Sequence, residues 1–332
     1  PALPSDSVRA GPMGPVSPAP ALAGAAAALL YGTVAVAMGF VNKAVMNVYG
    51  LRESNFILLA QMVATVVLMS LLRDVLGVVS FPAINPAQAR RLAPVAILYN
   101  ANVAFALASL GRVSIPTYNA VKRLTPAVVM ACNRAWRLAP DPSRAKALSV
   151  AVIVLGCVVA GAGDLEFDLG GYVSGFASCL LQAAYLIAVD RTGAERGVGS
   201  AELMTYNALL SAPLLLLATV ATGELSAGVA RVTRGVAESD GGFLATFASA
   251  LFAGALLNFS LFLCTLANSA LTTTVVGVLK GVASTLLGFF LLGGVKMSGM
   301  HVAGIAANTA GGIAYTVASQ AEKRRARAAF PK

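Results

Sequence analysis

The sequence predicts an all-α membrane protein with ten transmembrane helices, arranged as two inverted halves of five helices each. Composition is the first observation behind this prediction: the 332 residues are 58% hydrophobic and only 11% charged, whereas soluble chains are about 25% charged. The second is the length of the apolar runs, since about 20 apolar residues span a hydrocarbon core. The third is the uneven placement of basic residues in the connections. A soluble enzyme, a disordered regulator and a disulfide scaffold are therefore excluded.

The apolar runs are rich in Ala, Gly, Leu and Val, and none alternates as a strand would. They predict spans at 22–47, 55–73, 92–111, 115–136, 146–163, 170–189, 202–221, 243–266, 270–292 and 299–319. A half with an odd number of spans must be inverted relative to the next, so 22–163 and 170–319 are predicted to be inverted repeats. Residues 1–21 are predicted to form a disordered N-terminal arm and 321–332 a basic cytosolic tail.

Charge sets the predicted orientation. Most Lys and Arg residues of the connections lie on the side that holds both chain ends, which predicts two cytosolic termini, while the acidic turn at 164–168 lies on the other side. The net charge of +10 is then explained by topology and by contact with anionic lipid, so we expect the lipid bilayer and no nucleic acid as a partner. The 32 glycines fit close packing of helices in lipid.

Metal and cofactor chemistry find little support in the sequence. The four cysteines lie in apolar runs without the spacing of a metal site or a disulfide, and the single His301 cannot form a ligand set by itself. We therefore expect no metal and no cofactor. Apart from Asp190 and Glu202 at span boundaries, no predicted span carries an acidic residue for acid–base catalysis, so an enzyme is not expected.

Four basic residues lie inside the apolar runs, namely Lys43, Lys122, Arg123 and Lys280. A charge at the centre of a bilayer costs roughly 2.5–3.5 kcal/mol even on insertion scales, and no acidic residue in a span can pair with it. Snorkelling to the interface is the alternative, most of all for Lys43 and Arg123. Lys122 and Lys280 lie too deep for that, at comparable places in the fourth and ninth spans. They predict a water-filled cavity whose occupant is an anion.

Uncharged polar residues accompany these cations. An amide beside a tyrosine suits a nucleobase, because the amide hydrogen-bonds one edge of the base and the ring stacks on its face. The residues singled out on these grounds are Tyr118 before Lys122, Thr273 before Lys280, Gln61 in the second span, and Tyr206 with Asn207 in the seventh. Threonines in membrane helices are usually satisfied by their own backbone, which is the alternative for Thr273.

Several of these segments resemble the nucleotide-sugar transporters of the drug/metabolite transporter superfamily, in the branch for UDP-glucuronate and UDP-N-acetylglucosamine. The resemblance extends over residues 22–320. The segments that carry it are VNK at 41–43, AQMVATVV at 60–67, IPTYNAVKR at 115–123 and NSALTTTVVGVLK at 268–280.

The resemblance implies an antiporter that moves a UDP-sugar from the cytosol into the lumen of the Golgi or the endoplasmic reticulum, in exchange for the nucleoside monophosphate UMP, by alternating access. It implies that Tyr206 and Asn207 read the base, and that Gly277 and Lys280 lie on the sugar and phosphate side. With the residues above, the predicted substrate-binding set is Lys122, Lys280, Tyr206, Asn207, Gly277, Tyr118, Thr273, Gln61, Arg123 and Lys43.

Alternatives remain within and beyond this fold. Thr205 and Ala208, which flank the predicted base-reading pair, depart from the GDP-mannose branch, and Gly281 after the ninth-span lysine departs from the UDP-sugar and phosphate branches. Despite these departures, a GDP-sugar or organic-phosphate exchanger of the same fold is the alternative function. The sugar is left open. A membrane-embedded enzyme or scaffold is the alternative of another class. Whether the chain forms a homodimer is also left open.

Overall fold

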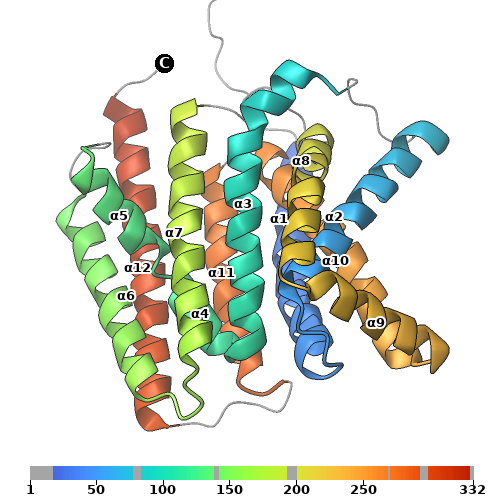
Figure 1. Ribbon diagram of the computed structural model, residues 1–332. Helices are drawn as coiled ribbons and strands as arrows, with labels where there is room; N and C mark the ends of the chain where they lie inside the picture. Colours follow the sequence, from blue (N-terminus) through green and yellow to red (C-terminus); the bar gives the residue numbers. More distant parts are fainter. Residues whose placement is uncertain are drawn as a thin grey trace, which may run out of the picture.

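The computed structural model describes residues 18–77, 84–137, 142–192, 200–267, 270–291 and 298–329, and all regular structure in these ranges is helical. Within them, it describes the backbone alone at 18–22, 189–192, 200, 262, 265–267, 270–275, 278 and 323–329. Figure 1 shows the helices running mostly side by side. They are α1 (Pro18–Asn47), α2 (Ser54–Ser70) with the π-helical turn η1 (Leu71–Val75), α3 (Pro86–Arg112), α4 (Ile115–Lys122), α5 (Thr125–Ala135), α6 (Arg144–Ala162), α7 (Leu169–Thr192), α8 (Ser200–Ala221), α9 (Glu224–Ala237), α10 (Gly241–Ala267), α11 (Ala270–Gly288) and α12 (Gly299–Ala329).

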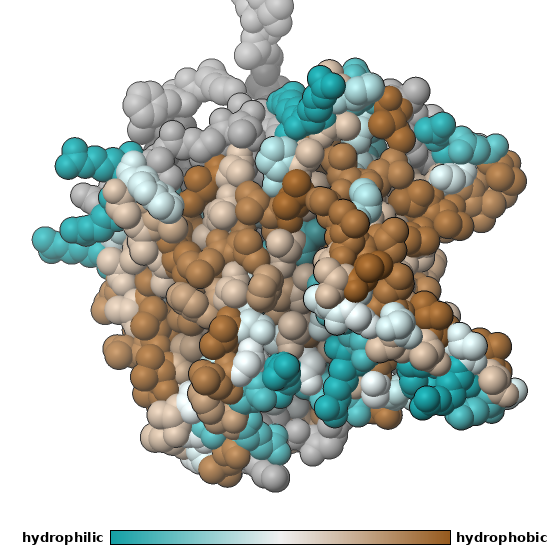
Figure 2. All heavy atoms as spheres, viewed as in Figure 1, coloured by the Kyte–Doolittle hydropathy of each residue, from teal (hydrophilic) through white to brown (hydrophobic). Residues whose placement is uncertain are grey.

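Seven helices in the described ranges are long and apolar enough to cross a membrane. The candidate spans are Ala23–Asn47, Ser54–Val75, Pro86–Arg112, Arg144–Ala162, Leu169–Ala188, Ala201–Ala221 and Gly241–Leu261. On the face shown in Figure 2, a broad apolar belt separates polar groups at the two ends of the molecule. The predicted all-helical, multi-pass membrane protein is confirmed at this level. The spans predicted at 270–292 and 299–319 correspond to α11 and α12, which are not among the seven.

The fourth predicted span, 115–136, is two short helices, α4 and α5, rather than one continuous helix. Pro126 explains the break, because proline has no N–H to donate and its ring clashes with the carbonyl four residues earlier, that of Lys122. The Thr125 hydroxyl takes over this carbonyl at 2.9 Å. The break therefore places Lys122 at the C-terminal end of α4, with Arg123 as the capping residue.

A further helix, α9, occupies a stretch predicted as a connection, and Figure 1 shows it running obliquely outward at the lower right of the bundle. The Glu224 carboxylate accepts the backbone N–H groups of Asn55 and Phe56, at the N-terminal end of α2, where a negative charge is favoured. Arg231 donates to the Tyr49 carbonyl and to Asp240. Charged contacts thus hold α9 against the ends of α1, α2 and α10.

The two predicted halves pack against each other through pairs of helices. Helices α1, α2, α3 and α6 of the first half lie against α10, α8, α7 and α12 of the second. The α6–α12 contact is the tightest: a Cβ on Gly156 or Gly304 would collide with the backbone of the facing helix. Small residues thus allow close approach, as the glycine content predicts. The interior between the two halves is where the polar residues gather.

Candidate substrate-binding site

The Lys122 ammonium group lies between α3 and α7, held by neutral oxygens. Its Nζ donates to Asn102 Oδ1 at 2.9 Å and to Ser178 Oγ at 2.7 Å. Ser178 also donates to Asn102 at 2.7 Å, and both partners are nearly inaccessible, with 0% and 7% exposure respectively. The position of Lys122 at the end of α4 adds a favourable interaction between its charge and the negative end of that helix.

Lys280 comes from α11 in the other predicted half and is held by Tyr31 of α1. Its Nζ donates to the Tyr31 hydroxyl at 3.1 Å and lies 4.8 Å from the centre of the same ring, in the range of a cation–π contact. Helix α4, which ends at Lys122, packs against α11, and Asn119 of α4 donates to Ser284 and Thr285 of α11. The fold therefore places side by side the two helices whose lysines the sequence puts in comparable spans.

Arg123 joins α4 to α11 and α12, again through neutral groups. Its guanidinium donates to Asn308 Oδ1 at 3.2 Å and to Thr285 Oγ1 at 3.4 Å. The ion pairs of the described residues are Arg73–Asp74, Arg112–Asp168, Lys146–Glu322 and Arg231–Asp240. None of them includes Lys122, Arg123 or Lys280, so within the described ranges these three cations have no carboxylate partner.

Open space and a free hydroxyl group lie near these cations. A Cβ added to Gly277, one turn before Lys280 in α11, would meet no atom of the described residues within 4 Å. Tyr118, one turn before Lys122, makes no side-chain hydrogen bond to the described residues. The Thr273 side chain lies outside the described residues.

Lys43 and Gln61 have structural partners. The Lys43 ammonium donates to the backbone carbonyls of Leu110, at 2.8 Å, and Val113, at 2.5 Å, at the C-terminal end of α3. A positive charge there satisfies carbonyls that have no partner within the helix. Gln61, 3% exposed, donates to Asn42 Oδ1 at 3.2 Å, and its side chain packs against Gly254 of α10.

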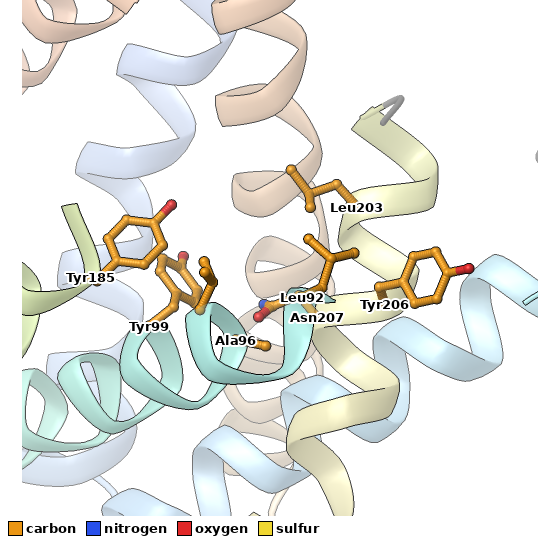
Figure 3. A pocket seen from close by; sticks show the side chains of 8 residues that line it. Leu92, Ala96, Tyr99, Tyr185, Leu203, Tyr206 and Asn207 are labelled. Carbon is orange, nitrogen blue, oxygen red and sulfur yellow. The ribbon is translucent and has the colours of Figure 1, made fainter. Parts of the chain in front are cut away.

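A small pocket of about 20 Å³ lies among α3, α7 and α8. In Figure 3, Tyr99 and Tyr185 lie at one end, and the Asn207 amide points toward Tyr99 and Ala96. The lining residues are Leu92, Val95, Ala96, Tyr99, Tyr185, Leu203, Tyr206 and Asn207.

The two residues predicted to read a base therefore share this pocket, although their hydrogen bonds differ. The Tyr206 hydroxyl accepts the Asn85 N–H at 2.7 Å, at the start of α3, and its ring is 3% exposed. Asn207, 8% exposed, accepts a hydrogen bond from Asn100 Nδ2 at 2.8 Å. Tyr206 is thus largely committed to packing, whereas Asn207 faces the pocket.

Sequence reasoning missed the partners that hold these groups. A single polar residue in an apolar span does not by itself indicate a site, and only the packing of the helices reveals what each one contacts. The residues missed for this reason are Tyr31, Asn100, Asn102 and Ser178. Polarity inside an apolar run is the one signal that marks them in the sequence.

The single histidine and the cysteines carry no site in the described part of the chain. His301 is fully buried, with Nδ1 2.7 Å from the Ala160 carbonyl and Nε2 3.3 Å from the Thr117 hydroxyl. Within the described residues the cysteines form no disulfide, and no cluster of metal-ligating side chains is found there. His301 thus packs and hydrogen-bonds as a core residue.

Together, these features define a class of protein: a multi-pass helical membrane protein with a polar interior that holds cations. The chain belongs to the Triose-phosphate Transporter family, whose model matches residues 24–316. The family and the relatives below are transporters, which agrees with the sequence prediction of transport rather than catalysis.

Three relatives show which proteins the chain is similar to in sequence. The chain is 44% identical over 298 residues to the UDP-galactose/UDP-glucose transporter 7 of Arabidopsis thaliana, covering 90% of each chain. It is 31% identical to the UDP-N-acetylglucosamine transporter UGNT1 of Arabidopsis thaliana, covering 85% of this chain and 83% of that one. It is 29% identical to the nucleotide sugar transporter SLC35D2 of Homo sapiens, covering 87% and 84% respectively.

Proposed function

We propose that this protein is a nucleotide-sugar antiporter that carries a UDP-sugar from the cytosol into the lumen of the Golgi or the endoplasmic reticulum, and returns UMP. The observation that carries the proposal is the pair Lys122 and Lys280, which lie on the packed helices α4 and α11 and whose hydrogen bonds within the described residues go to neutral groups. Its substrate class comes from the names of the relatives, which are UDP-sugar and nucleotide-sugar transporters.

The two lysines bind the phosphates. An ammonium group bound to a phosphate oxygen gains the attraction between two opposite charges in addition to the hydrogen bond, which a neutral oxygen does not supply. Asn102, Ser178 and Tyr31 therefore hold the lysines in the absence of substrate and yield them to a phosphate. Arg123, one residue beyond Lys122 at the break between α4 and α5, adds a third positive charge to the same region.

The other residues surround this centre. Asn207 and the tyrosine rings of its pocket receive the base, while the open space beside Gly277 and the hydroxyl of Tyr118 receive the sugar side. Thr273 belongs to the same segment of α11. Lys43 and Gln61 are assigned structural roles, because their polar groups are engaged by the protein itself.

Transport follows alternating access. Ten spans in two inverted halves, with both termini in the cytosol, place the phosphate site near the midplane, and rocking of one half against the other exposes it to each side in turn. Two cations that repel each other in the empty protein disfavour its reorientation, whereas a phosphate between them relieves the repulsion. The loaded carrier therefore moves more readily than the empty one, which couples entry of the UDP-sugar to exit of UMP.

Purified protein in liposomes preloaded with UMP tests this proposal. We expect uptake of labelled UDP-glucose or UDP-galactose that is at least about tenfold above uptake into empty liposomes. Equal uptake into both would contradict exchange. Inhibition by excess GMP rather than UMP would favour the alternative GDP-sugar exchanger, for which a 25% identical GDP-mannose transporter of Komagataella pastoris is a relative.

A further inference from the structure

Asn207, which lines the pocket among α3, α7 and α8, is hydrogen-bonded to a buried residue outside the pocket. Asn100 of α3 is 3% exposed and does not line the pocket, but its Nδ2 donates to Asn207 Oδ1 at 2.8 Å. The same Nδ2 donates to the Ala96 carbonyl at 2.8 Å and lies within reach of Ser211 Oγ. Asn100 therefore contacts the pocket only through Asn207.

These contacts determine which end of each amide faces which way. A backbone carbonyl only accepts hydrogen bonds, so the NH₂ end of Asn100 must point to Ala96, since its oxygen there would face another oxygen. The neighbouring end of Asn207 must then be its oxygen, because two NH₂ groups facing each other would repel. Asn207 is left with its own NH₂ directed away from Asn100.

The NH₂ group of Asn207 makes no hydrogen bond to the described residues, and Asn207 lines the pocket. Conversely, Asn100 Oδ1 is buried and has no hydrogen-bond partner among those residues. A buried polar atom left without a partner costs free energy. This arrangement fixes the direction of the Asn207 amide at the expense of one unsatisfied oxygen.

We propose that Asn100 is a positioning residue for base selection: it holds the Asn207 amide so that its NH₂ donates to the 4-carbonyl of uracil. Cytosine has an amino group at this position, which also donates, so two donors would face each other. The inference rests on the proposed function and adds to it the residue that makes the pocket prefer a uracil nucleotide to a cytosine nucleotide.

The variant Asn100→Asp tests the orientation directly. A buried carboxyl group in this apolar environment is neutral, and its O–H then donates to the Ala96 carbonyl. This hydroxyl oxygen takes the place of Nδ2 and, with its single hydrogen on Ala96, can only accept from Asn207. The Asn207 amide must therefore turn, donate its NH₂ to the substituted side chain and present its oxygen to the pocket. We expect the ratio of the affinities for UMP and CMP to fall at least about tenfold, with CMP bound more tightly than by the unaltered protein.

Two further variants keep the test falsifiable. Asn100→Leu removes the anchor without a new donor or acceptor, so the ratio falls toward one even if Asn100→Asp does not fold. Ser211→Ala is the matched control, because the hydrogen bond from Asn100 to Asn207 remains and the ratio should stay within about twofold of that of the unaltered protein.

Binding of UMP and CMP to each detergent-purified protein is measured by titration calorimetry. A folded Asn100→Asp or Asn100→Leu protein with an unchanged ratio would overturn the role of Asn100 and leave the proposed function standing. An unaltered protein that binds neither nucleotide would overturn both. A gain in CMP affinity, unlike a loss of stability, is not expected from a residue that only supports packing.

Discussion

Lys43 and Lys280 illustrate how differently two lysines in apolar runs are used. The Lys43 ammonium is bound by two backbone carbonyls at the end of α3, which cannot rotate away. The Lys280 ammonium is bound by one tyrosine hydroxyl and the face of its ring, both on a side chain that can move. Burial and charge are similar in the two cases, and the partners differ.

The difference shows which buried cations are available to a ligand. Fixed carbonyls satisfy Lys43 permanently and make it part of the scaffold. We expect the side-chain partners of Lys122 and Lys280 to exchange with a phosphate more easily, because side chains can move. Ser178, for example, still donates to Asn102 when Lys122 leaves.

Removing either central cation should have the largest effect on transport. Hydrogen bonds to charged groups contribute about 1.5–3 kcal/mol, so Lys122→Met and Lys280→Met should each lower exchange of UDP-sugar for UMP by about 10- to 100-fold. Initial rates in proteoliposomes, normalised to folded protein, measure this effect. Rates close to those of the unaltered protein in both variants would remove these lysines from the mechanism.

The scaffold lysine should show the opposite behaviour. Lys43→Met leaves the Leu110 and Val113 carbonyls without their donor, which should lower the free energy of unfolding by about 2 kcal/mol. Lys280→Met should leave stability nearly unchanged or raise it, because it removes a charge that is repelled by Lys122. Thermal unfolding in detergent compares the stabilities of the two variants. If Lys280→Met is as unstable as Lys43→Met, the two lysines do not differ in their structural role.

The break between α4 and α5 predicts a smaller effect. Thr125→Val leaves the Lys122 carbonyl without a donor, since Pro126 has none, and should destabilise the protein by about 1 kcal/mol. Thr65→Val is the matched control, because Thr65 is also buried but bonds the Gln61 carbonyl inside a continuous helix. Equal destabilisation in the two variants would show that the break does not depend on the threonine.

We expect the smallest effect at Asp240 in the α9–α10 turn, because its carboxylate is partly exposed to solvent and is paired with Arg231. The Phe243 N–H and Arg231 lower the pKa of its carboxyl group below the usual value. Because the pKa is lower in the folded state, the ionised carboxylate stabilises the fold at pH values above its ordinary pKa of 3.8. This stabilisation is lost as the pH falls through the folded-state pKa. Asp240→Asn should therefore narrow the stability difference between pH 7 and pH 3. An unchanged difference would contradict this role.

Much of this organisation is readable from the sequence, for stated physical reasons. Long apolar runs predict most helices, because the bilayer imposes their length. The position of Pro126 inside the fourth run was sufficient to predict the break, which a purely hydropathic interpretation overlooks. Helix α9 could not be predicted from hydropathy, because its apolar residues are too sparse to form a membrane span.

The candidate site is less accessible to sequence reasoning. Deep cations stand out by their solvation cost, so Lys122 and Lys280 could be predicted. The sequence sets Lys43 apart from them as a cation close to an interface, but its carbonyl partners could not be predicted because they lie on another helix. The direction of the Asn207 amide depends on Asn100, about a hundred residues earlier in the chain, and therefore on how α3 packs against α8.

The most direct test of the central cations compares the binding of UMP and uridine, which differ only in the phosphate. We expect the unaltered protein to bind UMP at least about 100-fold more tightly than uridine, and Lys280→Met to reduce this difference at least about tenfold while uridine binding stays similar. A folded Lys280→Met protein that keeps the full preference for UMP would contradict the account.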